Sequence, residues 1–176
     1  MIRILPLIVL VTFASCKNGE SLFSKNKNNR PSPPAKLAGK IDGTEIIINY
    51  SSPRVNDRTI WGDLVPYNRL WRTGANEATN IYIGKDVLIN GKPLPKGKYS
   101  LFTIPGENVW TVIFNKNWDL WGSYDYSENK DALRIQVSPY TLDQNKENLA
   151  FELKNNMITF KWEKKAFDLL VQSPEN

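Results

Sequence analysis

The sequence predicts an all-β domain: an antiparallel β-sandwich, jelly-roll or immunoglobulin-like, with at most one short helix. Two observations support this prediction. Turn-forming residues recur at short intervals, and the segments between them alternate apolar and polar side chains. No stretch sustains the apolar spacing of an amphipathic helix. Only residues 56–69 leave room for a single short helical turn.

Pairs of turn-forming residues separate the expected strands. Glycine and asparagine tolerate positive φ, and proline fixes its own φ, so such pairs reverse the chain with little strain. A pair between two apolar segments is typical of a β-hairpin. Such pairs stand at Asp42-Gly43, Asn90-Gly91, Pro105-Gly106 and Asn155-Asn156.

The segments between these turns place apolar residues at every second position. Successive side chains of a strand point to opposite faces, so each segment would present one apolar row to a core. Of the six tryptophans, we expect Trp61, Trp71, Trp110 and Trp162 to be buried because they fall within apolar patterns. The rows are 110/112/114, 133/135/137, 149/151/153 and 158/160/162.

Residues 1–15 are typical of a signal peptide. Arg3 precedes a short apolar run that ends in Ala14 and Ser15 and is too short for a stable membrane span. Cys16, the only cysteine, follows directly, and this arrangement resembles a bacterial lipoprotein signal. The resemblance implies a lipidated Cys16 and a domain outside the cytoplasm, anchored in the cell envelope at the outer membrane. An ordinary signal peptide with a chance cysteine is the alternative.

Residues 16–36 are rich in Lys, Asn, Ser and Pro and predict a flexible tether that begins at the lipidated cysteine. Residues 37–176 are long enough for one domain with a real core. The tether carries five basic residues and one acidic residue, whereas the chain after Lys36 carries 17 of each. The domain is therefore neutral, and we expect a membrane partner through the anchor but no nucleic acid.

The chain contains no histidine, which excludes Ser-His-Asp and Cys-His catalysis and histidine-based zinc sites. It has neither a phosphate-binding loop nor a dinucleotide fingerprint, so we expect no cofactor. The acidic residues within 125–131 lack the spacing of a calcium loop. We interpret them as a solvated turn and predict no metal site. A carboxylate pair, Glu77 with Asp57 or Asp63, keeps a hydrolase open as an alternative.

Residues 71–79, Trp-Arg-Thr-Gly-Ala-Asn-Glu-Ala-Thr, are the densest polar run of the chain. Gly74 and Asn76 allow two sharp turns, and Arg72 can pair with Glu77 across them. One interpretation is a loop that satisfies its own polar groups, pinned by Trp71 in the core. The other is a ligand site with Arg72, Asn76 and Glu77 as its polar groups.

Several short motifs of the sequence resemble those of a family of exported bacterial lipoproteins that is classified as a domain of unknown function. They are YSSPRV at 50–55, WRTGANEAT at 71–79 and YSLFTIP at 99–105, supported by RTIWG at 58–62 and LVPY at 64–67. The resemblance covers most of residues 37–171. It implies a β-sandwich in an exported, commonly lipidated protein, and it implies no activity and no catalytic residues.

Within that pattern the polar candidates are Arg54, Arg58, Arg72, Asn76 and Glu77. Three arginines near one acid would make a positive pocket suited to a carboxylate or another anion. The alternative is a buried arginine–glutamate network that joins the two sheets.

Trp118 and Trp121 lie in a loop-like run with four aromatic residues. They predict either a platform on which a sugar stacks or a lid over one end of the sandwich. The favoured function is a non-catalytic envelope module that binds a glycan or a small anionic ligand. The alternatives are a hydrolase using Glu77 and an Asp, and a structural or assembly lipoprotein.

Overall fold

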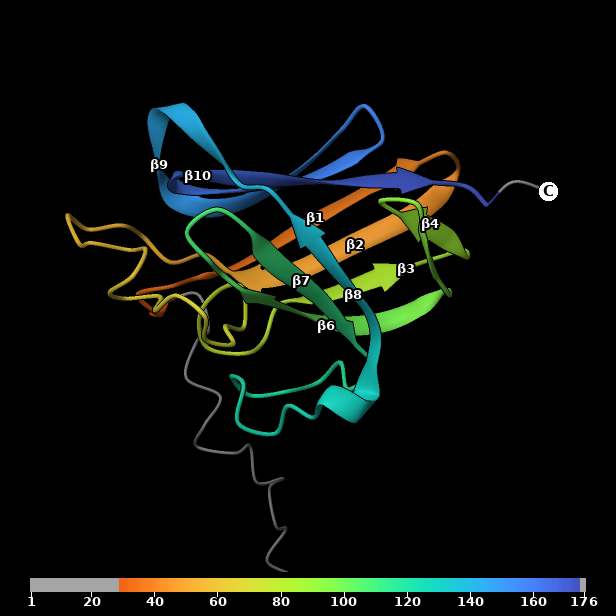
Figure 1. The fold of residues 1–176 in the computed structure, drawn as a ribbon, viewed down its shortest axis with the longest axis horizontal. Helices are drawn as coiled ribbons and strands as arrows, with labels where there is room; N and C mark the ends of the chain where they lie inside the picture. The colour runs from red at the N-terminus through yellow and green to blue at the C-terminus, as the bar shows by residue number, and fades with distance from the viewer. Residues whose placement is uncertain (1–28, 175–176) are drawn as a thin grey trace, which may run out of the picture.

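The structure is a computed structural model that describes residues 29–174. Two antiparallel sheets pack face to face, which confirms the predicted all-β sandwich (Figure 1). The six-stranded sheet has the order β1-β2-β3-β6-β7-β8 and the four-stranded sheet the order β5-β4-β10-β9. The strands are β1 (Pro34–Ile41), β2 (Thr44–Ser51), β3 (Asn80–Ile83), β4 (Val87–Ile89), β5 (Lys92–Leu94), β6 (Gly97–Ile104), β7 (Trp110–Asn115), β8 (Asp131–Val137), β9 (Tyr140–Lys154) and β10 (Met157–Gln172).

The short helical turn allowed for residues 56–69 is not there. That segment forms a series of turns tied by an isolated bridge between Trp61 and Val65. A 3-10 turn, η2 (Glu128–Lys130), lies elsewhere, before β8. Residues 56–69 form turns and no helix because Asn56, Asp57 and Gly62 all adopt positive φ, which an α-helix cannot accommodate.

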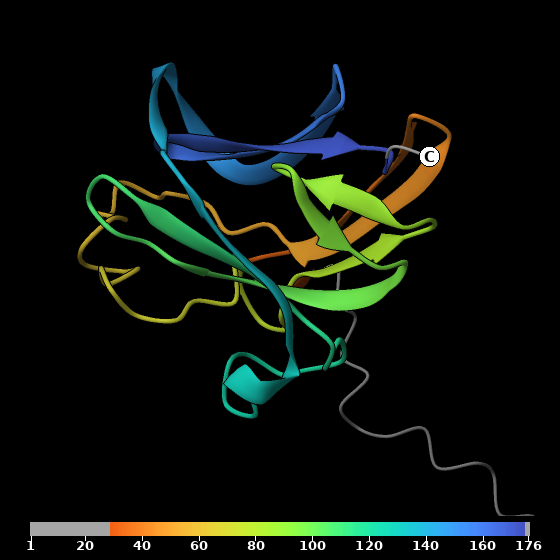
Figure 2. The same ribbon diagram turned by 45° about the vertical axis from the view of Figure 1, so that its right-hand side comes forward.

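The four predicted hairpins are confirmed, and the turn that begins with Pro105-Gly106 joins β6 to β7. Asp42 and Gly43 adopt positive φ between β1 and β2, and Asn155 and Asn156 do so between β9 and β10. The pair at 90–91 joins β4 to β5, a short hairpin beside β10 (Figure 2). Two successive residues with positive φ match the right-handed twist of the strands that they connect.

The core lies between the two sheets, and the predicted apolar rows face it. Trp110 of β7 and Trp162 of β10 are buried, as is Trp71, whose ring stacks on that of Trp162 with centroids 5.7 Å apart. Trp61 is only partly buried but packs against Trp110, with centroids 4.6 Å apart. Trp71, Trp110 and Trp162 are therefore core residues, as predicted.

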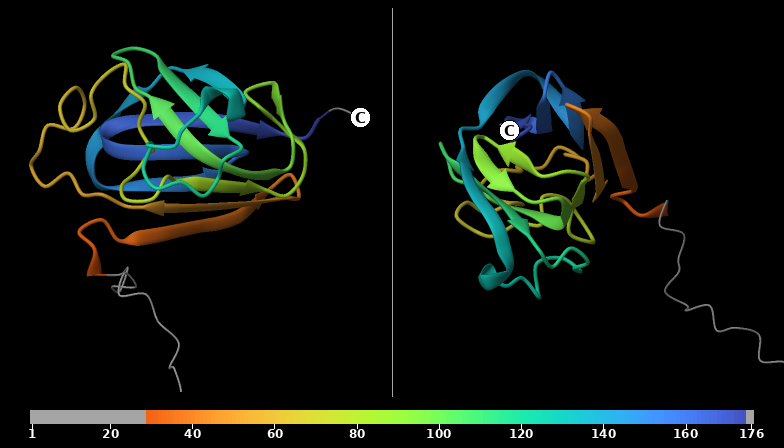
Figure 3. Two further views of the ribbon diagram at one scale, coloured as in Figure 1. Left: turned by 90° about the horizontal axis from the view of Figure 1, so that it is seen from below. Right: turned by 90° about the vertical axis from the view of Figure 1, so that its right-hand side faces the viewer.

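A second, smaller apolar cluster lies on the outer face of the six-stranded sheet. Phe102 of β6 and Ile113 of β7 point away from the core and are covered by Ala78 and Leu120. The segment between β7 and β8 therefore lies across this sheet instead of extending into solvent (Figure 3). This packing fixes the position of the segment between the two strands, residues 116–130, which we call the aromatic loop because it carries Trp118 and Trp121.

The fold begins earlier than the sequence predicted. β1 starts at Pro34, three residues before the expected domain start at residue 37, and the amide of Ser52 donates to the Pro33 carbonyl at 2.9 Å. Strand β1 is held by backbone pairing with β2, and amino-acid composition alone does not reveal such pairing. Residues 33–36 of the predicted tether therefore belong to the sandwich.

Cys16 and the predicted signal peptide lie outside the described residues. Within residues 29–174, no helix has the length and apolar character needed to cross a membrane.

Candidate functional site

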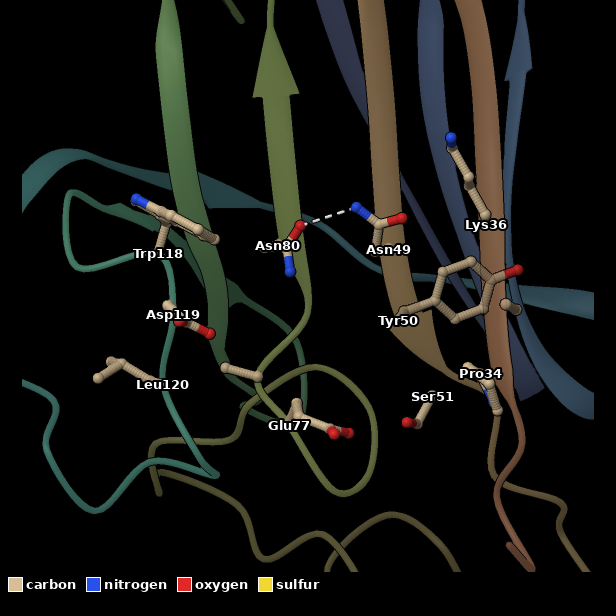
Figure 4. Close-up of a pocket in the computed structure, with 12 residues that line it drawn as sticks. Pro34, Lys36, Asn49, Tyr50, Ser51, Glu77, Asn80, Trp118, Asp119 and Leu120 are labelled. Atoms are coloured by element: carbon tan, nitrogen blue, oxygen red, sulfur yellow. Dashed lines mark hydrogen bonds between the residues drawn. The ribbon is translucent and has the colours of Figure 1, made fainter. Parts of the chain in front are cut away.

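A groove of about 350 Å³ runs over the outer face of the six-stranded sheet (Figure 4). Its floor comes from β1, β2 and β3, one wall from the aromatic loop after β7, and one end from the loop that precedes β3. Its polar and aromatic lining includes the side chains of Lys36, Asn49, Ser51, Glu77, Asn80, Trp118 and Asp119.

The floor of the groove is a cross-strand row of polar side chains. Lys36 is opposite Asn49 in the β1–β2 register, and Asn49 is opposite Asn80 in the β2–β3 register. These residues point outward because Ile48 and Ile81, next to them in sequence, point into the core. Strand pairing thus creates a polar row from residues far apart in sequence.

The two floor amides are joined side by side. Asn49 donates through Nδ2 to Oδ1 of Asn80 at 3.0 Å. Among the described residues, Oδ1 of Asn49 and Nδ2 of Asn80 have no further protein partner. The pair therefore offers an incoming molecule one acceptor and one amide donor group with fixed spacing.

The aromatic wall is Trp118, whose side chain remains 42% exposed. The Lys98 ammonium sits 4.5 Å from its ring centroid, a cation–π contact that orients the indole. Leu120, buried in the outer cluster, anchors the loop, and its carbonyl accepts a hydrogen bond from the Ala78 amide at 3.0 Å. The ring is therefore held in place while its surface stays accessible.

Glu77 closes one end of the groove. Nη1 of Arg30 donates to both of its carboxylate oxygens, at 3.0 and 2.8 Å. The same guanidinium lies 5.8 Å from the ring centroid of Trp121, which is 56% exposed. An isolated backbone bridge between Glu77 and Trp121 ties this end to the aromatic loop. Arg30 thus links the N-terminal segment to Glu77 and to Trp121.

The loop at 71–79 largely satisfies its own polar groups. Nε1 of Trp71 donates to the Gly74 carbonyl at 3.0 Å, and Oγ1 of Thr79 donates to the Thr73 carbonyl at 2.8 Å. Asn76, at a φ of 57°, donates through Nδ2 to the Ser32 carbonyl and to Oγ of Ser51. Asn76 therefore holds the N-terminal segment in place and does not line the groove.

The structure does not gather the predicted polar candidates into one pocket. Arg54 is exposed and pairs with Glu147 at 3.6 Å, whereas Arg58 and Arg72 line a separate hollow. Glu77 pairs with Arg30 instead of with Arg72. The chain turns through the left-handed residues Thr73 and Asn76, so Arg72 and Glu77 fall on different sides of the loop. Of the polar candidates, Glu77 thus lines the groove and Arg58 and Arg72 line the hollow, whereas Arg54 and Asn76 line neither.

The aromatic candidates stay near the groove. Trp118 lines it, and Trp121 lies beside its Glu77 end without lining it. The acidic residue Asp131 accepts hydrogen bonds from Asn115, Tyr126 and Arg134. Within residues 29–174, no group of three acidic residues is placed to hold a metal ion.

A family model described as "Protein of unknown function (DUF2911)" matches residues 32–171. The chain belongs to this family. The resemblance to a domain of unknown function is thereby confirmed, and the match starts two residues before β1 at Pro34. No curated protein and no solved structure matches the chain.

All residues that line the groove lie within the part of the chain matched by the DUF2911 model, whereas Arg30 lies outside it. Sequence reasoning selected Glu77 and Trp118 from this lining and missed Lys36, Asn49, Asn80 and Asp119. The signal for the two asparagines was present, because Asn49 interrupts the isoleucine-rich strand β2 and Asn80 begins the isoleucine-bearing strand β3, both at outward positions. Their adjacency, however, depends on the pairing of β2 with β3.

Proposed function

We propose that this DUF2911 domain is a non-catalytic binding module whose outer groove takes a hydroxyl-rich ligand of the glycan class. The observation that carries the proposal is the hydrogen-bonded pair Asn49–Asn80 on the floor beside the exposed face of Trp118. The volume of about 350 Å³ is within the range of small-molecule sites.

The chemistry of the groove suits a sugar. A hydroxyl group both donates and accepts, so it can use the unpaired Oδ1 of Asn49 and Nδ2 of Asn80 together. Asp119 adds an acceptor for further hydroxyls. A sugar ring also has apolar C–H faces, and one of these can pack on the indole of Trp118.

The charges of the groove favour a neutral ligand over an anion. Its charged lining residues are one cation, Lys36, and two carboxylates, Glu77 and Asp119. Because Arg30 pairs with Glu77, the remaining charges of Lys36 and Asp119 balance each other. The groove therefore offers a free anion no net positive charge, whereas neutral hydroxyls can form charge-assisted hydrogen bonds with the same groups. This supports the glycan half of the expected ligand class for the groove.

The geometry supports binding more than hydrolysis. Asp57 and Asp63, the expected partners of Glu77 in a hydrolase, are not among the groove-lining residues; the aspartate that lines the groove with Glu77 is Asp119, on the loop after β7. Both carboxylate oxygens of Glu77 already accept hydrogen bonds from the Arg30 guanidinium, an arrangement typical of a structural ion pair.

A glycan array followed by calorimetric titration tests the proposal. We expect one glycan class to bind, and Trp118→Ala and Asn80→Ala each to weaken binding at least tenfold. Tyr124→Ala and Asn145→Ala are matched controls, because both residues are exposed and lie outside the groove lining. Wild-type affinity in the Trp118 and Asn80 variants would rule out this groove, and release of a shorter sugar would identify a hydrolase instead.

We further propose that Cys16 is the lipidated N-terminus and anchors the domain in the cell envelope at the outer membrane. The support is the short apolar leader that ends in Ala14 and Ser15 directly before the sole cysteine. Mass spectrometry of the native protein should find a mature chain that begins with a lipidated Cys16. A mature chain that begins elsewhere and carries an unmodified Cys16 would overturn the anchor.

A further inference from the structure

A second hollow, of about 220 Å³, lies apart from the groove and shares no lining residue with it. Arg58 and Arg72 line it, together with the indoles of Trp71 and Trp162. We infer that this hollow is a binding site for a small oxyanion, a carboxylate or a phosphate group. The inference does not depend on the proposed glycan groove.

Among residues 29–174, no ion pair neutralises the positive charge of the hollow. Its lining includes two guanidinium groups and no carboxylate. Arg58 donates through Nε to the Val55 carbonyl at 3.0 Å and through Nη2 to the Arg54 carbonyl at 2.6 Å. These neutral acceptors fix the guanidinium without cancelling its charge.

Arg72 is the more exceptional cation. Within residues 29–174 its side chain has no ion pair and no hydrogen bond, and its Nε atom is buried without an acceptor. A buried guanidinium N–H without a partner is destabilising, and proteins rarely leave one in that condition. An oxyanion bound to the two free terminal nitrogens of Arg72 would compensate its charge.

The indoles add a second, independent observation. Trp162 is 1% exposed, and its Nε1 has no acceptor within the described part of the chain. The same holds for Nε1 of Trp61, whose ring centroid lies 5.8 Å from that of Trp162. The unpaired buried groups of the described residues are thus all donors, and Arg72 and Trp162 both line the hollow.

The walls of the hollow favour one compact charged group. Trp71, Trp162 and Val65 are buried apolar residues, and they lower the local dielectric around the two guanidinium groups. The planar, multi-donor guanidinium matches the oxygens of carboxylate and phosphate, which lysine does not. A neutral sugar would leave both charges uncompensated, so the hollow and the groove select different chemistry.

Two probes distinguish the sources of the oxyanion: inorganic phosphate, and glucuronate as a sugar carboxylate. Each is titrated at constant ionic strength into the wild-type domain while the indole N–H signals are followed by heteronuclear NMR. We expect saturable binding of at least one probe, with a shift of the Trp162 signal, which Trp162→Phe assigns. Arg58→Gln and Arg72→Lys should each weaken binding at least tenfold.

Arg54→Gln is the matched control, because Arg54 is a neighbouring exposed arginine that does not line the hollow. If Arg72→Lys does not fold, Arg58→Gln still decides, since Arg58 is exposed and its loss leaves the core intact. No saturable binding of either probe, or binding that Arg58→Gln leaves unchanged, would overturn the site. Trp118→Ala should leave phosphate binding unchanged, so failure here is distinguishable from failure of the glycan groove.

Discussion

At the scale of single residues, the role of a side chain could be predicted only where its partners are close to it in the sequence. Trp71 could be predicted to be buried because apolar segments flank it. The roles of Asn76 and Glu77 could not, because their partners, Ser32 and Arg30, lie more than forty positions away in the chain. Composition assigned those partners to a tether, and long-range hydrogen bonds leave no periodic trace in a sequence.

Trp71→Ala should destabilise the domain severely. The indole is buried, stacks on Trp162 and donates to the Gly74 carbonyl. Its removal leaves a cavity, and we expect the free energy of unfolding to fall by about 3–5 kcal/mol in urea denaturation. Trp121→Ala, at a 56% exposed position, is the control and should change it little. Equal urea midpoints for Trp71→Ala and the wild type would place Trp71 outside the core.

Tyr126 should make stability fall at high pH. Burial and the hydrogen bond to Asp131 raise the pKa of Tyr126 from 10.0 to about 12. The folded state therefore holds this proton more tightly than the unfolded state. Its contribution to stability is complete below pH 10 and is lost as the pH rises from 10 to 12.

Urea midpoints at pH 9 and pH 11 measure this effect. The wild type should lose more stability between the two values than Tyr126→Phe, which has no proton to release. Tyr124→Phe, at an 84% exposed position, should behave like the wild type. An equal loss in the wild type and Tyr126→Phe would show that Tyr126 does not contribute.

At the scale of elements, local rules predicted the hairpins and non-local pairing produced the groove. The turns at 42–43, 90–91 and 155–156 are short-range features, so the sequence places them correctly. The polar row Lys36–Asn49–Asn80 exists only because three strands meet in one register. A sequence without known partners cannot show that register, and the predicted site therefore followed neighbours along the chain instead of neighbours across the sheet.

Gly74→Ala should loosen the loop at 71–79. An added Cβ would lie 3.0 Å from Oγ1 of Thr79 and 3.1 Å from the Ser51 carbonyl oxygen, closer than ordinary contact. The loop would shift to relieve this, and its Trp71–Gly74 hydrogen bond would weaken. We expect a melting temperature several degrees lower, by differential scanning calorimetry. Gly91→Ala is a control for an added methyl group, since no atom lies within 4 Å of the Cβ position at residue 91. The positive φ of residue 91 makes the alanine variant somewhat strained. A Gly74→Ala variant no less stable than Gly91→Ala would show that the loop has room to adapt.

At the scale of the whole molecule, the described part of the N-terminal segment lies beside the groove. Residues 34–36 belong to β1, the edge strand of the six-stranded sheet. Arg30, just before them, forms an ion pair with Glu77 at the end of the groove. The segment that would lead to a lipidated Cys16 is thus part of the site's surroundings. The sequence predicted the sandwich and its core, but it placed this segment outside the fold.

A chain that starts at Leu37 should fold but should be less stable than one that starts at residue 29. It keeps residues 37–41 of β1 and the whole core, so the sandwich remains. It loses the strand pairs of residues 34–36 with 49–51, the Arg30–Glu77 ion pair and the hydrogen bond from Asn76 to Ser32. Calorimetry should therefore show a lower melting temperature, with the unfolding transition still cooperative.

Glu77→Gln in the longer chain separates the ion pair from the strand. Gln keeps the shape of Glu but loses the charge that attracts Arg30, and part-exposed ion pairs of this kind contribute about 1 kcal/mol or less. Most of the loss in the shorter chain should therefore come from the missing strand pairs, so Glu77→Gln should be clearly more stable than the chain from Leu37. Equal melting temperatures of the unsubstituted chains from residue 29 and from Leu37 would contradict this. They would show that the contacts of β1 before Leu37 do not stabilise the fold, and that residues 29–36 are the dispensable tether that composition suggested.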